Sequence, residues 1–355
     1  MKARQTKFEI LRILAMMMII AMHYMTKGMS IPKLSEDMGI VNHLWWLLYA
    51  ACNVAVNVYV LISGYFMIDA KWNIGKVIRL VAEVLFYSWI VPLCLGAVGV
   101  VNLGSLDFTN ILTILLPIEE EHYWFATSYV MLYLLSPILV AAVKNLEKKQ
   151  LQTVIVALLI MFGGLKSINP YLIPWDKYGY DILWFICLFL VAGYIRVYGI
   201  GIYSNKKKSL VMYIAGVLVT WGICALCAVI VRATNNLEYY MDMTYAYNYV
   251  TVLWAAVSLF YVFIHIPERE YRCGKIINRI AACTFGVYLL HENVMIRGCW
   301  QTWLGIENAN GQWWQIIHMI LCVIVVFAIG VLVDLVRNGI FTAFIMLFGK
   351  GKNDR

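Results

Sequence analysis

Long apolar stretches recur along the whole chain, and they constrain the fold more than any other feature. A helix that crosses a bilayer needs about 20 mostly apolar residues. Ten stretches of roughly this length occur, at 8–26, 44–68, 77–101, 123–143, 151–168, 181–198, 209–231, 247–265, 277–297 and 313–337. The stretch 108–118 is shorter and is expected to form an interfacial or re-entrant helix. The sequence therefore predicts one all-α domain over residues 1–355, a polytopic membrane bundle of ten transmembrane helices.

Composition supports a membrane protein and argues against a soluble one. Of the 355 residues, 63% are hydrophobic and only 14% are charged, which is fewer charges than soluble domains usually carry. Membrane topology explains the net charge of +8, so no nucleic acid partner is predicted. Cys224 and Cys227 form a CxxC pair inside an apolar stretch, and without a second pair we interpret them as packing residues.

The basic residues orient the predicted helices, because Lys and Arg concentrate in cytoplasmic loops. With the N-terminus in the cytoplasm, all but six of the 28 Lys and Arg residues fall on the inner side. The six outer residues are Lys27, Lys33, Lys166, Lys177, Arg232 and Arg297. We therefore predict that both termini are cytoplasmic and that the first span is retained rather than cleaved as a signal peptide.

The first span carries Glu9, Arg12 and His23. Charged groups in lipid cost a few kcal/mol each, so they tend to mark function. The spacing from Arg12 to His23 places them about 20° apart around a helix and roughly 16 Å apart along it. One face is therefore predicted to hold a cation and a base in register, with a tunnel for a long substrate between them. A local ion pair with Glu9 is the alternative explanation for Arg12.

Other polar residues are expected at the depth of His23. His122 opens the fourth span, and His291 and Glu292 lie near the outer end of the ninth. An imidazole oriented by a carboxylate, which Glu292 or the cluster Glu119–Glu121 could supply, can act as a general base near neutral pH. Each histidine taken alone is also explained by packing or by interfacial hydrogen bonds.

Aromatic residues gather at the same outer side, with Trp124 and Tyr288 in the spans and further Trp and Tyr residues in the loop 166–180. Such residues commonly anchor a protein at the membrane surface. They are also typical of a sugar-binding cleft, and the sequence leaves both interpretations open.

A second polar set lies in the inner half, where Ser63 and Tyr65 end the second span and Lys76 and Arg79 begin the third. Topology explains the basic residues, which would also suit a phosphate-bearing ligand from the cytoplasm. Three further polar residues are expected to form hydrogen bonds between helices, namely Asn53, Asn57 and Asp334.

Together these residues resemble the integral-membrane acyltransferase family 3, ten-helix enzymes that O-acylate envelope glycans. The resemblance is carried by Arg12-x10-His23, Ser63-Gly64-Tyr65, Lys76 with Arg79, His122-Tyr123-Trp124-Phe125 and Tyr288-Leu289-Leu290-His291. One departure is Glu9, where the family often has Asp. The resemblance implies acetyl-CoA or another acyl-CoA as the cytoplasmic donor and a carbohydrate acceptor of the cell envelope. It also implies His23 as the catalytic imidazole and Arg12 as a donor-binding or structural cation.

On this basis we assign roles to the remaining candidates. His291 and Glu292 are predicted to assist His23 in catalysis, and no metal is predicted. The donor site is predicted to comprise Arg12, Ser63, Tyr65, Lys76 and Arg79, and the acceptor pocket His122, Trp124 and Tyr288. The expected location is a bacterial cytoplasmic membrane.

Two questions of function stay open. Many family members carry an extracytoplasmic domain that completes acyl transfer, so this chain is expected to act alone, with a separate extracytoplasmic partner, or as the membrane half of something larger. Some relatives are associated with amino-acid handling, which makes a transporter of a small polar solute or a glycan flippase the alternative. The sequence has no evident pair of Gly- or Pro-broken helices in symmetric positions, as many transporters have.

Overall fold

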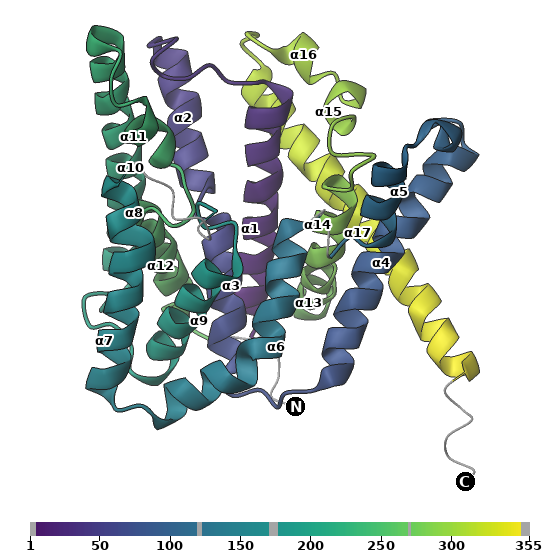
Figure 1. Cartoon of the computed structure of the whole chain (residues 1–355), viewed down its shortest axis with the longest axis horizontal. Coiled ribbons are helices and arrows are strands. Elements are labelled where there is room, and N and C mark those ends of the chain that lie inside the picture. The colour runs from purple at the N-terminus through teal and green to yellow at the C-terminus, as the bar shows by residue number, and fades with distance from the viewer. Residues whose placement is uncertain (1–4, 119–122, 170–176, 269–270, 349–355) are drawn as a thin grey trace.

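The computed structural model describes residues 5–118, 123–169, 177–268 and 271–348, and within these ranges the chain forms helices and no strands (Figure 1). Seven helical segments are long and apolar enough to cross a membrane: Thr6–Gly28, Ile40–Met67, Ile74–Ala97, Trp124–Asn145, Lys148–Ile168, Lys206–Thr234 and Gln315–Phe344. The protein is therefore a multi-pass, all-helical membrane protein, and these segments coincide with seven of the predicted spans.

The other three predicted spans consist of shorter helices. Two are single apolar helices, α9 (Ile182–Val197) and α12 (Val250–Ile264). The third, predicted at 277–297, is divided into α13 (Gly274–Ala282) and α14 (Thr284–His291), and turns follow α14. A count of ten spans therefore depends on these shorter helices.

Several long segments are interrupted. Helix α1 (Thr6–His23) continues as a π-helical turn, Tyr24–Gly28. The segment Ile40–Met67 comprises α2 (Ile40–Cys52) and α3 (Ala55–Met67), and Lys148–Ile168 comprises α7 (Lys148–Leu159), a π-helical turn and α8 (Leu165–Ile168). The remaining helices are α4 (Ile74–Ala97), α5 (Phe108–Leu115), α6 (Trp124–Asn145), α10 (Lys206–Thr234), α11 (Glu238–Met243), α15 (Trp300–Trp303), α16 (Ile306–Ala309) and α17 (Gln315–Phe348).

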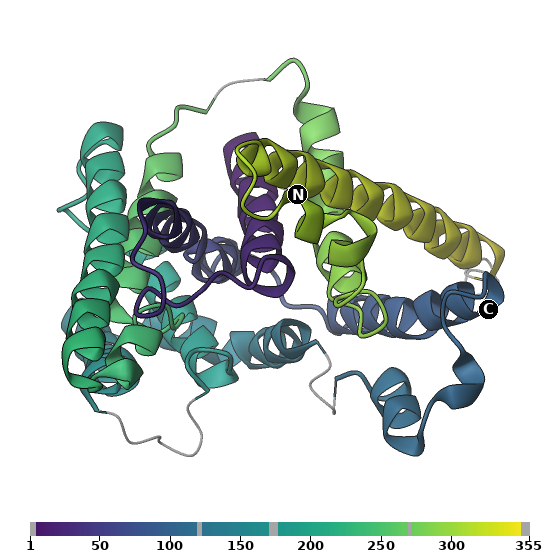
Figure 2. The ribbon, with the colours of Figure 1, turned by 90° about the horizontal axis from the view of Figure 1, so that it is seen from above.

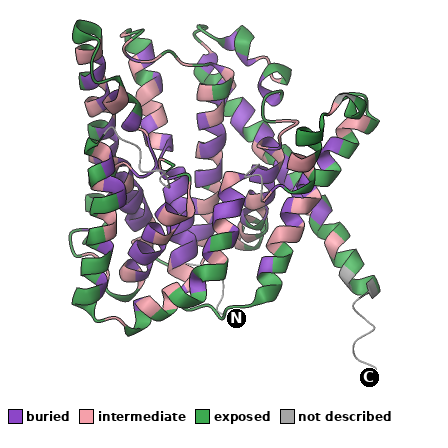
Figure 3. Cartoon of the chain, in the orientation of Figure 1, coloured by how far each residue is buried: buried purple, intermediate pink, exposed green. Residues whose placement is uncertain are grey.

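Helix α1 and the α2–α3 segment form the centre of the bundle (Figure 3). Within their most apolar windows, 61% and 78% of residues are buried, against 28% for α7–α8 and for α17. The outer helices instead expose apolar side chains, such as Leu332 and Val336 of α17. An apolar exterior is expected where lipid is the solvent. Helices α4, α5 and the end of α17 extend away from the rest on one side (Figures 1 and 2).

Buried amides connect the central helices to their neighbours. Asn53 and Asn57 donate to the backbone carbonyls of Tyr245 and Tyr247, each over 2.8 Å. Trp184 of α9 donates its Nε1–H to Oδ1 of Asn57 over 3.0 Å. The predicted hydrogen bond between helices is therefore confirmed for Asn57, whereas the side chain of Asn53 donates to a loop carbonyl instead.

A buried cluster of charges joins α4 to α17. Arg337 lies 2.9 Å from Glu83 and 2.8 Å from Asp334, and Tyr87 donates to Asp334 over 2.9 Å. We predicted Asp334 as an interhelical hydrogen-bonding residue, which is confirmed. Arg337, the last residue of the predicted tenth span, lies inside α17, which continues to Phe348, and its exposure is 3%.

Replacing Arg337 with leucine removes the cation that neutralises two buried carboxylates. Breaking a buried pair in this way usually costs about 3–5 kcal/mol, because the partner charge stays buried. We therefore expect Arg337→Leu to lower the melting temperature of the detergent-solubilised protein strongly. Arg232→Leu, at an exposed position of α10, serves as the control and should change stability little. Equal melting temperatures for the two variants would contradict a stabilising role of the cluster.

Candidate functional site

Two cavities lie one after the other along α1, on the side that faces α3 and α6. The first, of about 290 Å³, contains His23 in its wall and is called the His23 cavity. The second, of about 450 Å³, contains Arg12 and is called the Arg12 cavity. Residues one helical turn apart contribute to the two cavities, namely Tyr59 and Ser63 of α3 and Phe125 and Tyr129 of α6. Arg12 and His23 therefore face the same two helices, as their spacing predicts.

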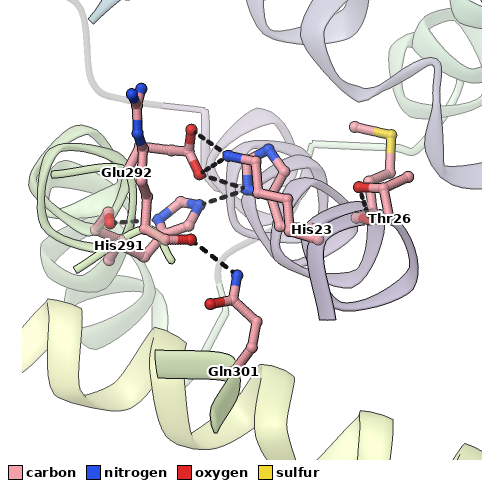
Figure 4. A network of polar contacts seen from close by, with 9 residues as sticks. His23, Thr26, His291, Glu292 and Gln301 are labelled. Carbon is pink, nitrogen blue, oxygen red and sulfur yellow. Dashed lines mark hydrogen bonds and ion pairs between the residues drawn. The ribbon is translucent and has the colours of Figure 1, made fainter. Parts of the chain in front are cut away.

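His23 is held by residues from the end of α14 (Figure 4). Its Nδ1 lies 3.2 Å from Nε2 of His291 and 3.1 Å from Oε1 of Glu292. Nδ1 of His291 lies 2.7 Å from the carbonyl oxygen of Val287. Lys27 donates to both oxygens of Glu292 over 2.6 and 2.7 Å. The structure thus brings together the three predicted catalytic residues, from segments 268 positions apart in sequence.

The hydrogen bonds determine which nitrogen of His23 is basic. A carbonyl oxygen can only accept, so His291 carries its proton on Nδ1 and offers a lone pair at Nε2. Both groups that face Nδ1 of His23, His291 Nε2 and the Glu292 carboxylate, are then acceptors. Nδ1 of His23 therefore carries the proton, and in the neutral imidazole the lone pair is at Nε2. Among the described residues, no hydrogen bond is found to this nitrogen, and the side chain of His23 lines the cavity.

Sequence reasoning missed Lys27, which it counted only as an outer basic residue. The regular helix ends at His23, and the following π-helical turn carries Lys27. Such turns occur often at functional sites. The signal was the spacing of four residues from His23, which places the two side chains on one helical face.

The walls of the His23 cavity are mainly aromatic. Predicted acceptor residues Trp124 and Tyr288 both line it. The ring of Trp124 lies 4.5 Å from that of Tyr180, which belongs to the aromatic loop noted in the sequence, and stacks on Tyr247, a loop residue that the sequence did not single out. Exposed Arg297 adds a cation to the same wall.

Two predictions at this end of the bundle lie outside the described residues: His122 and the cluster Glu119–Glu121. The structure therefore places neither of them relative to His23.

The Arg12 cavity contains part of the predicted donor site. Arg12 donates to Glu9 over 2.9 Å, so the local ion pair does form. Ser63 and Lys76 line the cavity with Arg12, and so does Lys71, which was not singled out. The cavity therefore has three basic side chains in its wall.

Tyr65 and Arg79 do not line this cavity. The ring of Tyr65 packs under the guanidinium of Arg196, 4.7 Å from its centroid, and against Phe8. Arg79 is exposed on α4, one turn before Glu83. The structure thus separates these two residues from the rest of the predicted donor site.

A layer of packed side chains separates the two cavities, which share no lining residue among those described. Within this layer, Phe125 stacks on Tyr129 at 5.8 Å, and Tyr129 donates to Ser63 over 3.1 Å. Tyr59 and Thr284 share a hydrogen bond of 2.7 Å. These five residues are called the central layer. The predicted tunnel is therefore interrupted in this structure.

The group around His23 could also hold a metal ion. One ligand atom each from His23, His291 and Glu292 lies within 4.8 Å of the others, and such a set suits zinc. However, Lys27 already neutralises both oxygens of Glu292, and Nδ1 of His23 hydrogen-bonds to both neighbours. The geometry therefore fits a hydrogen-bonded network better than a metal centre.

Comparison with known protein families places the chain. A family model described as an acyltransferase domain matches residues 6–349 of the chain. No curated protein and no solved structure matches the chain.

If the network around His23 needs no metal, treatment with EDTA should leave the thermal stability of the purified protein unchanged. A bound ion would stabilise the folded state in proportion to its occupancy, so its removal would lower the melting temperature. We expect less than about 0.1 zinc per chain by elemental analysis and the same melting temperature before and after chelation. Stoichiometric zinc together with a fall in melting temperature would contradict this interpretation.

Proposed function

The chain belongs to the acyltransferase family whose model matches residues 6–349, and on this premise we propose that it transfers an acetyl group from cytoplasmic acetyl-CoA to a hydroxyl of an envelope carbohydrate. In this proposal the chain has ten spans with both termini in the cytoplasm of a bacterial cell and lies in the plasma membrane. The donor enters at the Arg12 cavity, and the acceptor binds at the His23 cavity on the opposite side.

One observation carries the proposal: His23 lines an aromatic cavity, its Nδ1 is held by His291 and Glu292, and no hydrogen bond to its Nε2 is found among the described residues. A general base needs a nitrogen within hydrogen-bond reach of the proton that it removes. Its imidazolium form must also be stabilised. Glu292 lies 3.1 Å from the opposite nitrogen and supplies the negative charge, while Lys27 keeps this carboxylate ionised and in place.

The chemical step follows from this arrangement. Nε2 of His23 takes the proton of the acceptor hydroxyl while the hydroxyl oxygen attacks the thioester carbonyl. Collapse of the tetrahedral intermediate breaks the carbon–sulfur bond and releases CoA. The proton on His23 then passes to the departing thiolate, so the products are the ester and free CoA thiol. No metal takes part in this scheme.

The Arg12 cavity suits the phosphates of CoA, because Arg12, Lys71 and Lys76 line it and guanidinium and ammonium groups bind phosphate well. About 16 Å of α1 separates Arg12 from His23. A long, thin pantetheine arm would bridge this distance. The central layer blocks the path of the pantetheine arm, so the proposal requires Phe125 and Tyr129 to move when the donor binds.

The aromatic residues that line the His23 cavity suit the binding of a sugar ring. Trp124, Tyr180, Tyr247 and Tyr288 line it, and aromatic faces pack against the apolar faces of sugars while phenol groups bond to hydroxyls. The acceptor is delivered from the envelope side, directly or through a separate extracytoplasmic protein. No observation in the structure specifically favours a transporter or flippase.

His23→Ala should remove the base and lower acyl transfer by about 10²–10⁴-fold, the usual contribution of general base catalysis. The assay measures CoA thiol released from acetyl-CoA by the purified protein, with and without an envelope glycan extract. His265→Gln is the control, since His265 hydrogen-bonds to the carbonyl of Tyr203 and lines neither cavity. Unchanged turnover in His23→Ala, or solute uptake without donor turnover, would contradict the proposal.

Lys76→Gln should raise the KM for acetyl-CoA while leaving kcat nearly unchanged, because Lys76 is far from the reacting atoms. An exposed charge contact is worth roughly 1 kcal/mol, which corresponds to about a fivefold rise. Arg79→Gln removes an equal charge from the same helix but outside the cavity, and should have a smaller effect. Equal effects of both substitutions would point to a general electrostatic attraction rather than a donor site at the Arg12 cavity.

A further inference from the structure

A third cavity, of about 1260 Å³, lies between α7, α9 and α12 and is called the α7 groove. It shares no lining residue with the His23 or Arg12 cavities. Its lining changes character along α7. Lys148, Gln152 and Thr153 line the beginning of the helix, and apolar side chains line the remainder as far as Ile160.

The apolar part of the α7 groove is continuous across three helices. Its side chains come from α7, α9 and α12 and include Ile155, Val156, Val191, Leu253 and Val257. From Lys148 to Ile160 the helix rises about 18 Å. This is close to half of the roughly 30 Å hydrocarbon core of a bilayer, so the groove has the depth of one leaflet.

The mouth of the α7 groove is positively charged. The Nζ of Lys148 lies 5.4 Å from the ring centroid of Tyr198, and no carboxylate among the described residues forms an ion pair with it. The loop that lines the groove through Tyr203 leads directly into Lys206–Lys208 at the start of α10. Glu147, the adjacent acidic residue, is engaged as the N-cap of α7.

We propose that the α7 groove binds an anionic phospholipid, with its phosphate at Lys148 and one acyl chain along α7 past Val156 and Ala157. The charge of the mouth favours an anionic headgroup over a zwitterionic one, and basic pockets between helices on the cytoplasmic side are known to bind such lipids. Gln152, which donates to the hydroxyl of Tyr194 over 2.6 Å, places further polar groups near the headgroup. This inference does not depend on the proposed enzymatic activity.

The test measures which lipid the full-length protein retains. Purified protein in mild detergent is incubated with an equal mixture of phosphatidylglycerol and phosphatidylcholine that have identical acyl chains, and bound lipid is quantified by native mass spectrometry. We expect the unmodified protein to retain about fivefold more phosphatidylglycerol, since one lysine near a membrane surface contributes on this scale.

Three variants distinguish lipid binding in the α7 groove from nonspecific attraction of anionic lipid to surface charge. Lys148→Gln should abolish the preference for phosphatidylglycerol but retain lipid. Lys149→Gln, which removes the neighbouring exposed lysine outside the groove lining, should behave like the unmodified protein. Ala157→Trp fills the groove from an exposed position and should reduce the binding of both lipids.

Several results would overturn the proposal. These are an unmodified protein without lipid preference, equal effects of Lys148→Gln and Lys149→Gln, and an Ala157→Trp variant that retains phosphatidylglycerol as before. If Ala157→Trp failed to fold, Val156→Phe would provide the same steric test from the neighbouring exposed position.

Discussion

The contact between His23 and the His291–Glu292 pair is the interaction on which the candidate site depends. It joins the end of α1 to the end of α14 and defines which imidazole nitrogen is free. The end of α14 at His291, inside the ninth predicted span, matters here, because Glu292 follows the helix and meets both His23 and Lys27. The chemistry of the site therefore follows from where two helices end.

The cost of burying a charge explains why two other charged groups inside the bundle, Arg12 and Arg337, have partners of opposite charge. Placing a charge in an apolar environment costs several kcal/mol unless a partner compensates it. Arg12 has Glu9, and Arg337 has both Glu83 and Asp334. The two groups differ in setting. Arg12 also borders a cavity with Lys71 and Lys76, whereas the Arg337 cluster joins α4 to α17. This difference separates a candidate binding residue from a structural one.

Much of this architecture was predictable from sequence because apolar length and helical period are local properties. The long helices lie where the apolar stretches are, and the register of Arg12 with His23 follows from 3.6 residues per turn. Contacts between helices were harder to predict from the sequence. The shared depth of His23 and His291 suggested proximity, but the sequence did not reveal the carbonyl of Val287 that orients His291.

The errors have a common origin in packing. The tenth span was predicted to end at Arg337, yet α17 continues beyond it and Arg337 is buried. A continuous tunnel was expected from register alone, but the packing of Phe125 and Tyr129 interrupts it. Lys27 was treated as a topological residue, although the π-helical turn after His23 directs it to Glu292.

In the proposed reaction, a donor held at Arg12 reaches His23 through the central layer. A cryo-EM structure of the protein with a non-hydrolysable acetyl-CoA analogue tests whether it does. We expect CoA phosphates beside Arg12 and Lys76, a displaced Tyr129, and the carbonyl of the analogue within about 4 Å of the site facing Nε2 of His23. An analogue bound elsewhere, or bound at Arg12 with the central layer closed and the carbonyl remote from His23, would contradict it.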